Sequence, residues 1–223
     1  MKWTIPNILT VLRLLAAPGV AVMFLYFARP WADWFAMLLF IVAAVTDYID
    51  GYLARAWKQE SAFGAMLDPI ADKAMVVIAL LVITGFSGMD PWILLPATVI
   101  LFREVFVSGL REYLGDRAGL LKVTVLAKYK TFAQMIALTV LFATGIFRHD
   151  FFDRIQGMDE AMVEAIMTGV ETDHVGLLWY AQATNVTWWT GVILLWIAAT
   201  LTLVTGFDYF TKALPFFRKG ETR

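Results

Sequence analysis

The sequence predicts an all-α integral membrane protein with six transmembrane helices. Hydrophobic residues make up 60% of its 223 residues, and the mean hydropathy is +0.69. An ordinary soluble domain is roughly 45–50% apolar, so the excess is expected to face lipid rather than to fill a larger core. Six apolar runs of about 20 residues are each long enough to cross the hydrocarbon layer as a helix.

The six helices are predicted at 8–28, 33–57, 62–85, 91–113, 124–147 and 188–212. Pro30 separates the first from the second, and the polar turn at 58–61 separates the second from the third. Gly85, Gly88 and Pro91 divide the third from the fourth, and the stretch 115–119 precedes the fifth. We assign 1–223 to one membrane domain, with 148–187 as an extracytoplasmic insertion between the fifth and sixth helices and helical character over 159–168.

The lysine and arginine residues orient these helices. With the N-terminus inside, fifteen of the eighteen fall on the inner side, which leaves Arg29, Arg148 and Arg154 outside. Short cytoplasmic segments carry such an excess. We therefore expect a multi-pass protein of the inner (cytoplasmic) membrane whose acidic motif, described next, faces the cytoplasm.

Four aspartates follow a fixed spacing within this apolar chain. The motif reads Asp47-x2-Asp50-Gly51-x2-Ala54-Arg55-x8-Gly64-x3-Asp68-x3-Asp72. Positions 47, 50, 51 and 54 share one face of the second helix, and 64, 68 and 72 share one face of the third. The short turn at 58–61 makes the two helices antiparallel neighbours, so the acidic faces can converge.

Ionised carboxylates beside lipid cost several kcal/mol each unless an opposite charge holds them. The chain has no cysteine, and hard carboxylate oxygens suit Mg²⁺ or Mn²⁺. We expect two such ions and a metal-dependent enzyme at a membrane. The alternatives are interhelical ion pairs, a water-filled pocket, or a divalent-cation carrier. A carrier is disfavoured because the acids lie at the helix ends and no inverted repeat is visible.

The string from Asp47 to Asp72 resembles the signature of CDP-alcohol phosphatidyltransferases at every fixed position. The resemblance implies the six-helix fold of that family, a homodimer, and displacement of CMP from a CDP-linked lipid or alcohol by a second alcohol. It implies that Asp47, Asp50 and Asp68 ligate metal, and that Asp72 also ligates and acts as the base. It further implies a cytidine diphosphate site lined by Gly51, Ala54 and Arg55, to which we add the small residue Gly64.

Basic residues on the fourth helix suggest the acceptor. Arg103 and Arg111 lie along one ridge of the helix, and Arg103 follows an apolar run in which a lone cation is expensive. A phosphate-bearing acceptor would neutralise it, and we place Lys128 in the same pocket. Arg117, Lys122 and Lys130 are assigned to topology and lipid headgroups. Pairing of the two arginines with Glu104 and Glu112 remains an open alternative.

The strings 103–105, 108–113 and 127–135 resemble the branch of the family that joins CDP-diacylglycerol to glycerol 3-phosphate, although Ala127 stands where glycine is expected. The strings 6–13 and 67–73 resemble the same branch. The expected partners are those two substrates, membrane lipids and a second copy of the chain, with no nucleic acid. Inositol phosphate, serine and phosphatidylglycerol are alternative acceptors. Asn7, Thr10 and Arg13 can help shape the acceptor pocket, or they can cap and anchor the first helix.

Overall fold

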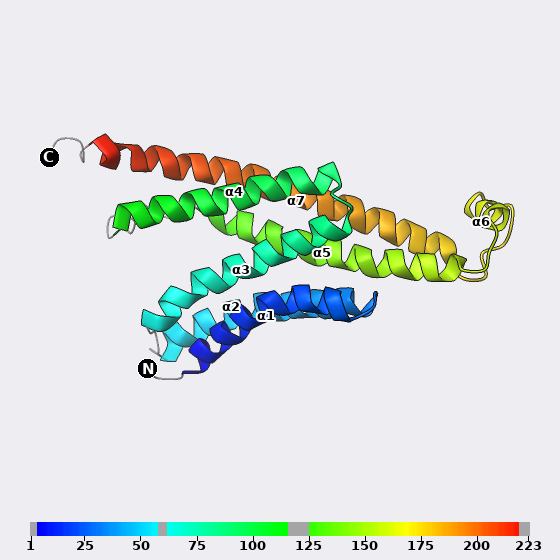
Figure 1. Cartoon of the computed structure of the whole chain (residues 1–223), viewed down its shortest axis with the longest axis horizontal. Helices are drawn as coiled ribbons and strands as arrows, with labels where there is room; N and C mark the ends of the chain where they lie inside the picture. The colour runs from blue at the N-terminus through cyan, green and yellow to red at the C-terminus, as the bar shows by residue number, and fades with distance from the viewer. Residues whose placement is uncertain (1–3, 58–61, 116–124, 219–223) are drawn as a thin grey trace. The chain divides into compact units, whose positions relative to one another are not determined.

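The computed structural model describes residues 4–57, 62–115 and 125–218, without the side chains of residues 6, 47–57, 62, 65, 125, 127 and 128. Every regular element in these residues is an α-helix (Figure 1). The helices are α1 (Ile5–Tyr26), α2 (Trp31–Trp57), α3 (Ala62–Phe86), α4 (Pro91–Leu114), α5 (Val125–Ile155), α6 (Glu160–Met167) and α7 (Leu177–Arg218).

The bounds of α1 to α4 lie within three residues of the predicted ones. The signals that separate α3 from α4 act as expected, since Gly88 has a positive φ of 69°. Asp90 then caps α4, because its side chain accepts a hydrogen bond of 2.8 Å from the backbone N–H of Trp92, and Pro91 occupies the first turn. Gly115, with φ 53°, ends the helix.

The helices on either side of the predicted insertion are longer than expected. α5 runs to Ile155, eight residues past the predicted end, and α7 begins at Leu177, eleven residues before the predicted start. The 42 residues of α7 extend about 63 Å at 1.5 Å per residue, twice the roughly 30 Å hydrocarbon layer. Falling hydropathy marks where lipid contact ends, but it does not end a helix, and α5 continues almost to Gly157, which has φ 87°.

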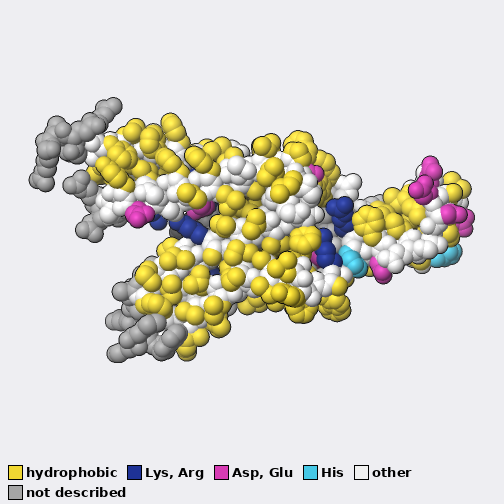
Figure 2. Space-filling model, viewed as in Figure 1, with side chains coloured by type: hydrophobic (Ala, Val, Ile, Leu, Met, Phe, Trp, Pro, Cys, Tyr) yellow, Lys and Arg dark blue, Asp and Glu magenta, His cyan; other side chains and the backbone are white. Residues whose placement is uncertain are grey.

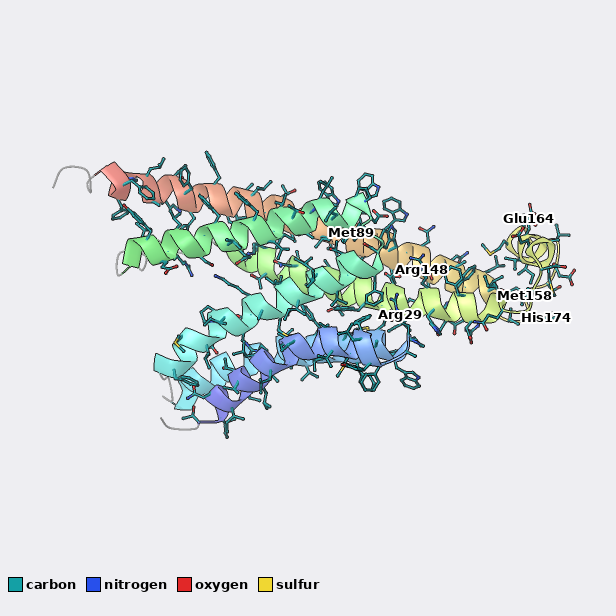
Figure 3. All side chains as sticks on the ribbon, viewed as in Figure 1. Arg29, Met89, Arg148, Met158, Glu164 and His174 are labelled. Atoms are coloured by element: carbon teal, nitrogen blue, oxygen red, sulfur yellow. The ribbon has the colours of Figure 1, made fainter. Side chains whose placement is uncertain are left out.

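The residues between α5 and α7 contain α6, which confirms the predicted helical character of 159–168. Asp159 caps the N-terminus of α6. Acidic side chains gather around the α6 region in Figure 2. Figure 3 labels Glu164 and His174 in the same region. Asp173 stabilises the first turn of α7 by accepting backbone hydrogen bonds. The backbone N–H of Leu178, and then those of Leu177 and Val175, donate to its carboxylate, which holds the pKa of Asp173 below its usual value.

Four helical segments in the described residues are long and apolar enough to cross a membrane. They are Asn7–Tyr26, Pro91–Leu114, Tyr129–Ile155 and Leu177–Phe217, and the shorter segment Trp31–Thr46 is also apolar. Hydrophobic side chains cover much of the face drawn in Figure 2. The chain is therefore a multi-pass membrane protein, whereas the number of six spans remains a prediction.

The chain divides into two compact units. The first comprises Met1–Ile83 and Leu138–Gly191, and the second comprises Thr84–Ala137 and Val192–Arg223. In the first, α1 packs along α2, and the rings of Phe24 and Phe40 both contact Phe142. In the second, α4 lies beside the C-terminal half of α7, where Leu110 and Tyr209 belong to one buried apolar cluster. Each unit thus has its own packed interior.

An ion pair with a buried carboxylate lies at the turn between α1 and α2 in the first unit. Both guanidinium contacts from Arg29 to the carboxylate of Asp33 measure 2.6 Å, and the Asp33 side chain is only 2% exposed. Arg29 lies at this turn in Figure 3. Gly145 of α5 makes room for the pair, because a Cβ at this position would lie 2.7 Å from Cγ of Asp33.

We expect Gly145→Ala to destabilise the first unit, by up to about 3 kcal/mol if the buried carboxylate of Asp33 loses Arg29. The added methyl group has to displace two side chains that hold each other in place. The thermal unfolding midpoint of the purified protein in detergent measures this loss. Gly19→Ala is the matched control, since a Cβ there meets nothing within 4 Å. Equal midpoints for the two variants would contradict the expectation.

Candidate active site

The described part of the acidic motif lies on α3 and contacts α1. Asp68 and Asp72 are one turn apart and so share a face of α3. The hydroxyl of Thr10 donates to Oδ1 of Asp68 at 2.6 Å. Nη1 of Arg13 donates to Oδ1 of Asp72 at 2.9 Å, which makes a salt bridge. The structure therefore brings two predicted site residues of α1 together with two of α3.

Burial differs between the two sides of these contacts. Thr10 is 2% exposed and Arg13 is 4% exposed, and Asn7, one turn earlier on α1, is also buried. The side chain of Asp72 is 49% exposed, and Asp68 is partly exposed. The donors of α1 therefore hold the carboxylates from the protein interior, while the carboxylates keep an accessible side on which a ligand can bind.

The other half of the motif lies on α2, whose helical range contains Asp47, Asp50, Gly51, Ala54 and Arg55. The side chains of these five residues lie outside the described ones. Gly64, on α3, is buried. No group of three or more potential metal-ligating side chains occurs among the described residues, a set without Asp47 and Asp50. The two described carboxylates fit a hard divalent cation, since they offer oxygen ligands from one helix face.

A buried charged cluster occupies the second unit. Glu104 accepts hydrogen bonds at its Oε1 from Nη1 of Arg103, at 3.1 Å, and from Nζ of Lys130, at 2.5 Å. The three side chains are 15% exposed or less. Two cations thus share one carboxylate, and Nε of Arg103 is buried without a hydrogen-bond partner in the described residues. Gly206 of α7 admits the arginine stem, because a Cβ there would lie 2.9 Å from Cγ of Arg103.

The other predicted acceptor residues have different surroundings. Nε of Arg111 donates to the hydroxyl of Tyr209 at 3.2 Å, and the guanidinium lies 5.5 Å from the centre of that ring. The side chain of Lys128 lies outside the described ones. Lys130, assigned from sequence to topology, is instead buried against Glu104. Its position two residues after Lys128, and so on a different face of α5, was the signal that could have separated the two lysines.

The sequence left open that Arg103 and Arg111 pair with Glu104 and Glu112 instead of a phosphate. The structure shows such a pairing for Arg103. Glu104 is the carboxylate that pairs with Arg103. For Arg111 the described partner is a phenol hydroxyl and its ring. The arginine pair belongs to the second unit and the aspartate pair to the first.

Comparison with known proteins identifies the class. Residues 3–204 match the family described as CDP-alcohol phosphatidyltransferase. The chain therefore belongs to the CDP-alcohol phosphatidyltransferase family. Membership confirms the resemblance seen in the aspartate motif, and with it the prediction of a phosphatidyltransferase enzyme.

Several relatives carry one name. A Cereibacter sphaeroides protein named CDP-diacylglycerol–glycerol-3-phosphate 3-phosphatidyltransferase is 64% identical over 220 residues, which cover 98% of this chain and 99% of the relative. Proteins of the same name from Salmonella choleraesuis and Escherichia coli K12 are each 39% identical over 171 residues, which cover 75% of this chain and 90% of theirs.

Proposed function

We propose that this enzyme transfers a phosphatidyl group from CDP-diacylglycerol to glycerol 3-phosphate, forming phosphatidylglycerophosphate and releasing CMP in phospholipid biosynthesis. The observation that carries the proposal is the 64% identity, over nearly the whole chain, to a relative named for these two substrates. The motif residues and the basic residues of α4 add physical support, because each supplies a group that the reaction needs.

The acidic motif is the proposed reaction centre. Asp47, Asp50, Asp68 and Asp72 would hold two Mg²⁺ or Mn²⁺ ions, which supply charge stabilisation for the pyrophosphate and the departing CMP when bound. Asp72 would also accept the proton of the attacking hydroxyl, and its half-exposed side chain leaves room for that hydroxyl to approach. Gly51, Ala54, Arg55 and Gly64 would form the cytidine diphosphate site, where small residues let the ligand approach the backbone.

The acceptor phosphate is assigned to the basic residues of α4 and the start of α5. Arg103 offers a buried N–H without a hydrogen-bond partner in the described residues, and Arg111 is oriented by Tyr209. Guanidinium groups match phosphate oxygens well. Lys128 is the third proposed ligand, and Lys130 would support Arg103 through their shared Glu104.

The setting of the reaction follows from its substrates. CDP-diacylglycerol has two acyl chains, whereas glycerol 3-phosphate and CMP are water-soluble, so the site must lie near a membrane surface. The distribution of lysine and arginine favours the cytoplasmic side of the inner membrane. A homodimer is proposed from the family resemblance, and the segment 148–187 is proposed to lie on the opposite side.

An acceptor assay with purified protein tests the proposal. CDP-diacylglycerol in detergent micelles is mixed with Mg²⁺ or Mn²⁺ and radiolabelled glycerol 3-phosphate, inositol phosphate, serine or phosphatidylglycerol in separate reactions. We expect labelled phospholipid and stoichiometric CMP with glycerol 3-phosphate, and loss of both when EDTA removes the metal. Product from another acceptor alone would refute the substrate assignment. Divalent-cation flux into vesicles without CMP release would instead favour a carrier.

A further inference from the structure

We propose that Thr10 and Arg13 are positioning residues that hold the carboxylates of Asp68 and Asp72 in the orientation that binds the divalent cation. The inference rests on the proposed function, because it concerns the same metal site. It assigns to α1 a task beyond crossing the membrane, and its evidence lies entirely within the first unit.

The two contacts fix the register of one helix against another. Thr10 and Arg13 are separated by three residues on α1, and their partners Asp68 and Asp72 are separated by four residues on α3. Both sequence positions increase together, so the two helices run in the same direction, as Figure 1 also shows. Neighbouring turns of α1 therefore meet neighbouring turns of α3, and a rotation or slip of α1 would break both contacts together.

The hydroxyl of Thr10 contacts another helix, whereas those of Thr144 and Thr202 bond within their own helices. Thr144 and Thr202 donate to carbonyl oxygens four residues earlier in their own helices, a common way for a helix to satisfy a hydroxyl. The hydroxyl of Thr10 reaches a side chain 58 residues away on another helix. A bond of that kind restricts the rotamer of Asp68.

Charge and burial indicate the same role for Arg13. A guanidinium that is 4% exposed is costly without a paired carboxylate, and Asp72 is that partner although half of the aspartate side chain remains exposed. Each contact engages Oδ1 of a carboxylate that has a second oxygen. The α1 donors can therefore orient both carboxylates, as hydrogen bonds to metal ligands do elsewhere.

Binding of Mn²⁺ alone, without substrate, tests Thr10. Free Mn²⁺ is counted by electron paramagnetic resonance as it is titrated into the purified full-length protein in detergent. We expect Thr10→Val to weaken binding about tenfold or more, as loss of such supporting contacts commonly does, and Thr10→Ser to bind within about threefold of the wild type because it keeps the hydroxyl. Thr144→Val is the matched control, since its hydroxyl bonds within its own helix in the same unit.

The outcomes separate this inference from the proposed function. If the wild type binds Mn²⁺ and Thr10→Val binds it equally well, Thr10 does not position the site, and the metal proposal stands. If the wild type binds no Mn²⁺, the metal part of the proposed function fails, and this inference fails with it. A similar weakening in Thr144→Val would show a general effect of the lost hydroxyl and would also overturn the inference.

Steady-state kinetics test Arg13. We expect Arg13→Gln to lower kcat about tenfold at saturating concentrations of both substrates, since the reacting carboxylate is no longer held, and Arg13→Lys to lose less because it keeps the charge. An effect limited to the KM for glycerol 3-phosphate, with kcat unchanged, would show that Arg13 binds the acceptor and would overturn its positioning role.

Discussion

Asp72→Asn is expected to reduce phosphatidyl transfer by about 10²–10⁴-fold, the range that a positioned base contributes. The amide cannot take a proton from the attacking hydroxyl, and it is a weaker cation ligand than a carboxylate. The change should leave the fold intact, because the amide oxygen can still accept the 2.9 Å hydrogen bond from Arg13. Substantial binding of CDP-diacylglycerol should remain, since the groups proposed to contact it are unchanged.

Two measurements on the same preparation check this expectation. CMP release reports turnover, and retention of radiolabelled CDP-diacylglycerol reports binding. Asp208→Asn is the matched control, because Asp208 forms an exposed pair with Lys212 on α7 and the variant should keep activity within about twofold, as exposed pairs contribute little. Full turnover by Asp72→Asn would remove Asp72 from the role of base.

Arg111→Ala is expected to raise the KM for glycerol 3-phosphate by about 10- to 100-fold, with little change in the KM for CDP-diacylglycerol. A hydrogen bond to a charged group contributes about 1.5–3 kcal/mol, which corresponds to that range. The structure sharpens the prediction, since Tyr209 fixes the direction of the guanidinium through its hydroxyl and its ring. Initial rates with each substrate varied in turn provide the two KM values.

Tyr209→Phe tests whether the orientation of Arg111 matters. This variant keeps the ring beneath the guanidinium and removes the hydroxyl that accepts from Nε, so we expect an increase of only a few-fold in the acceptor KM. An unchanged unfolding midpoint shows that the buried cluster around Tyr209 survives. Equal increases in both KM values for Arg111→Ala would argue against a pocket for the acceptor phosphate.

Much of the architecture could be predicted from local sequence features. The bounds of α1 to α4 follow from apolar runs and from turn signals such as Pro30 and Gly88, because helix formation depends mainly on consecutive residues. The motif from Asp47 to Asp72 identified the family for a similar reason, since its spacing defines two helix faces. The predicted α5 and α7 were too short. Hydropathy reports lipid contact, whereas both helices continue beyond their most apolar parts.

The sequence by itself determined the membrane class, the family and the acidic motif that is the proposed reaction centre. Only the tertiary structure decided which side chains contact that motif and which contact the charged residues of α4: Thr10 and Arg13 meet aspartates 58 and 59 residues away, and Lys130 joins Glu104 across 26 residues. The physical reason is that periodicity specifies which face of a helix a residue occupies. Which neighbour that face meets, and at what register, depends on the packing of whole helices.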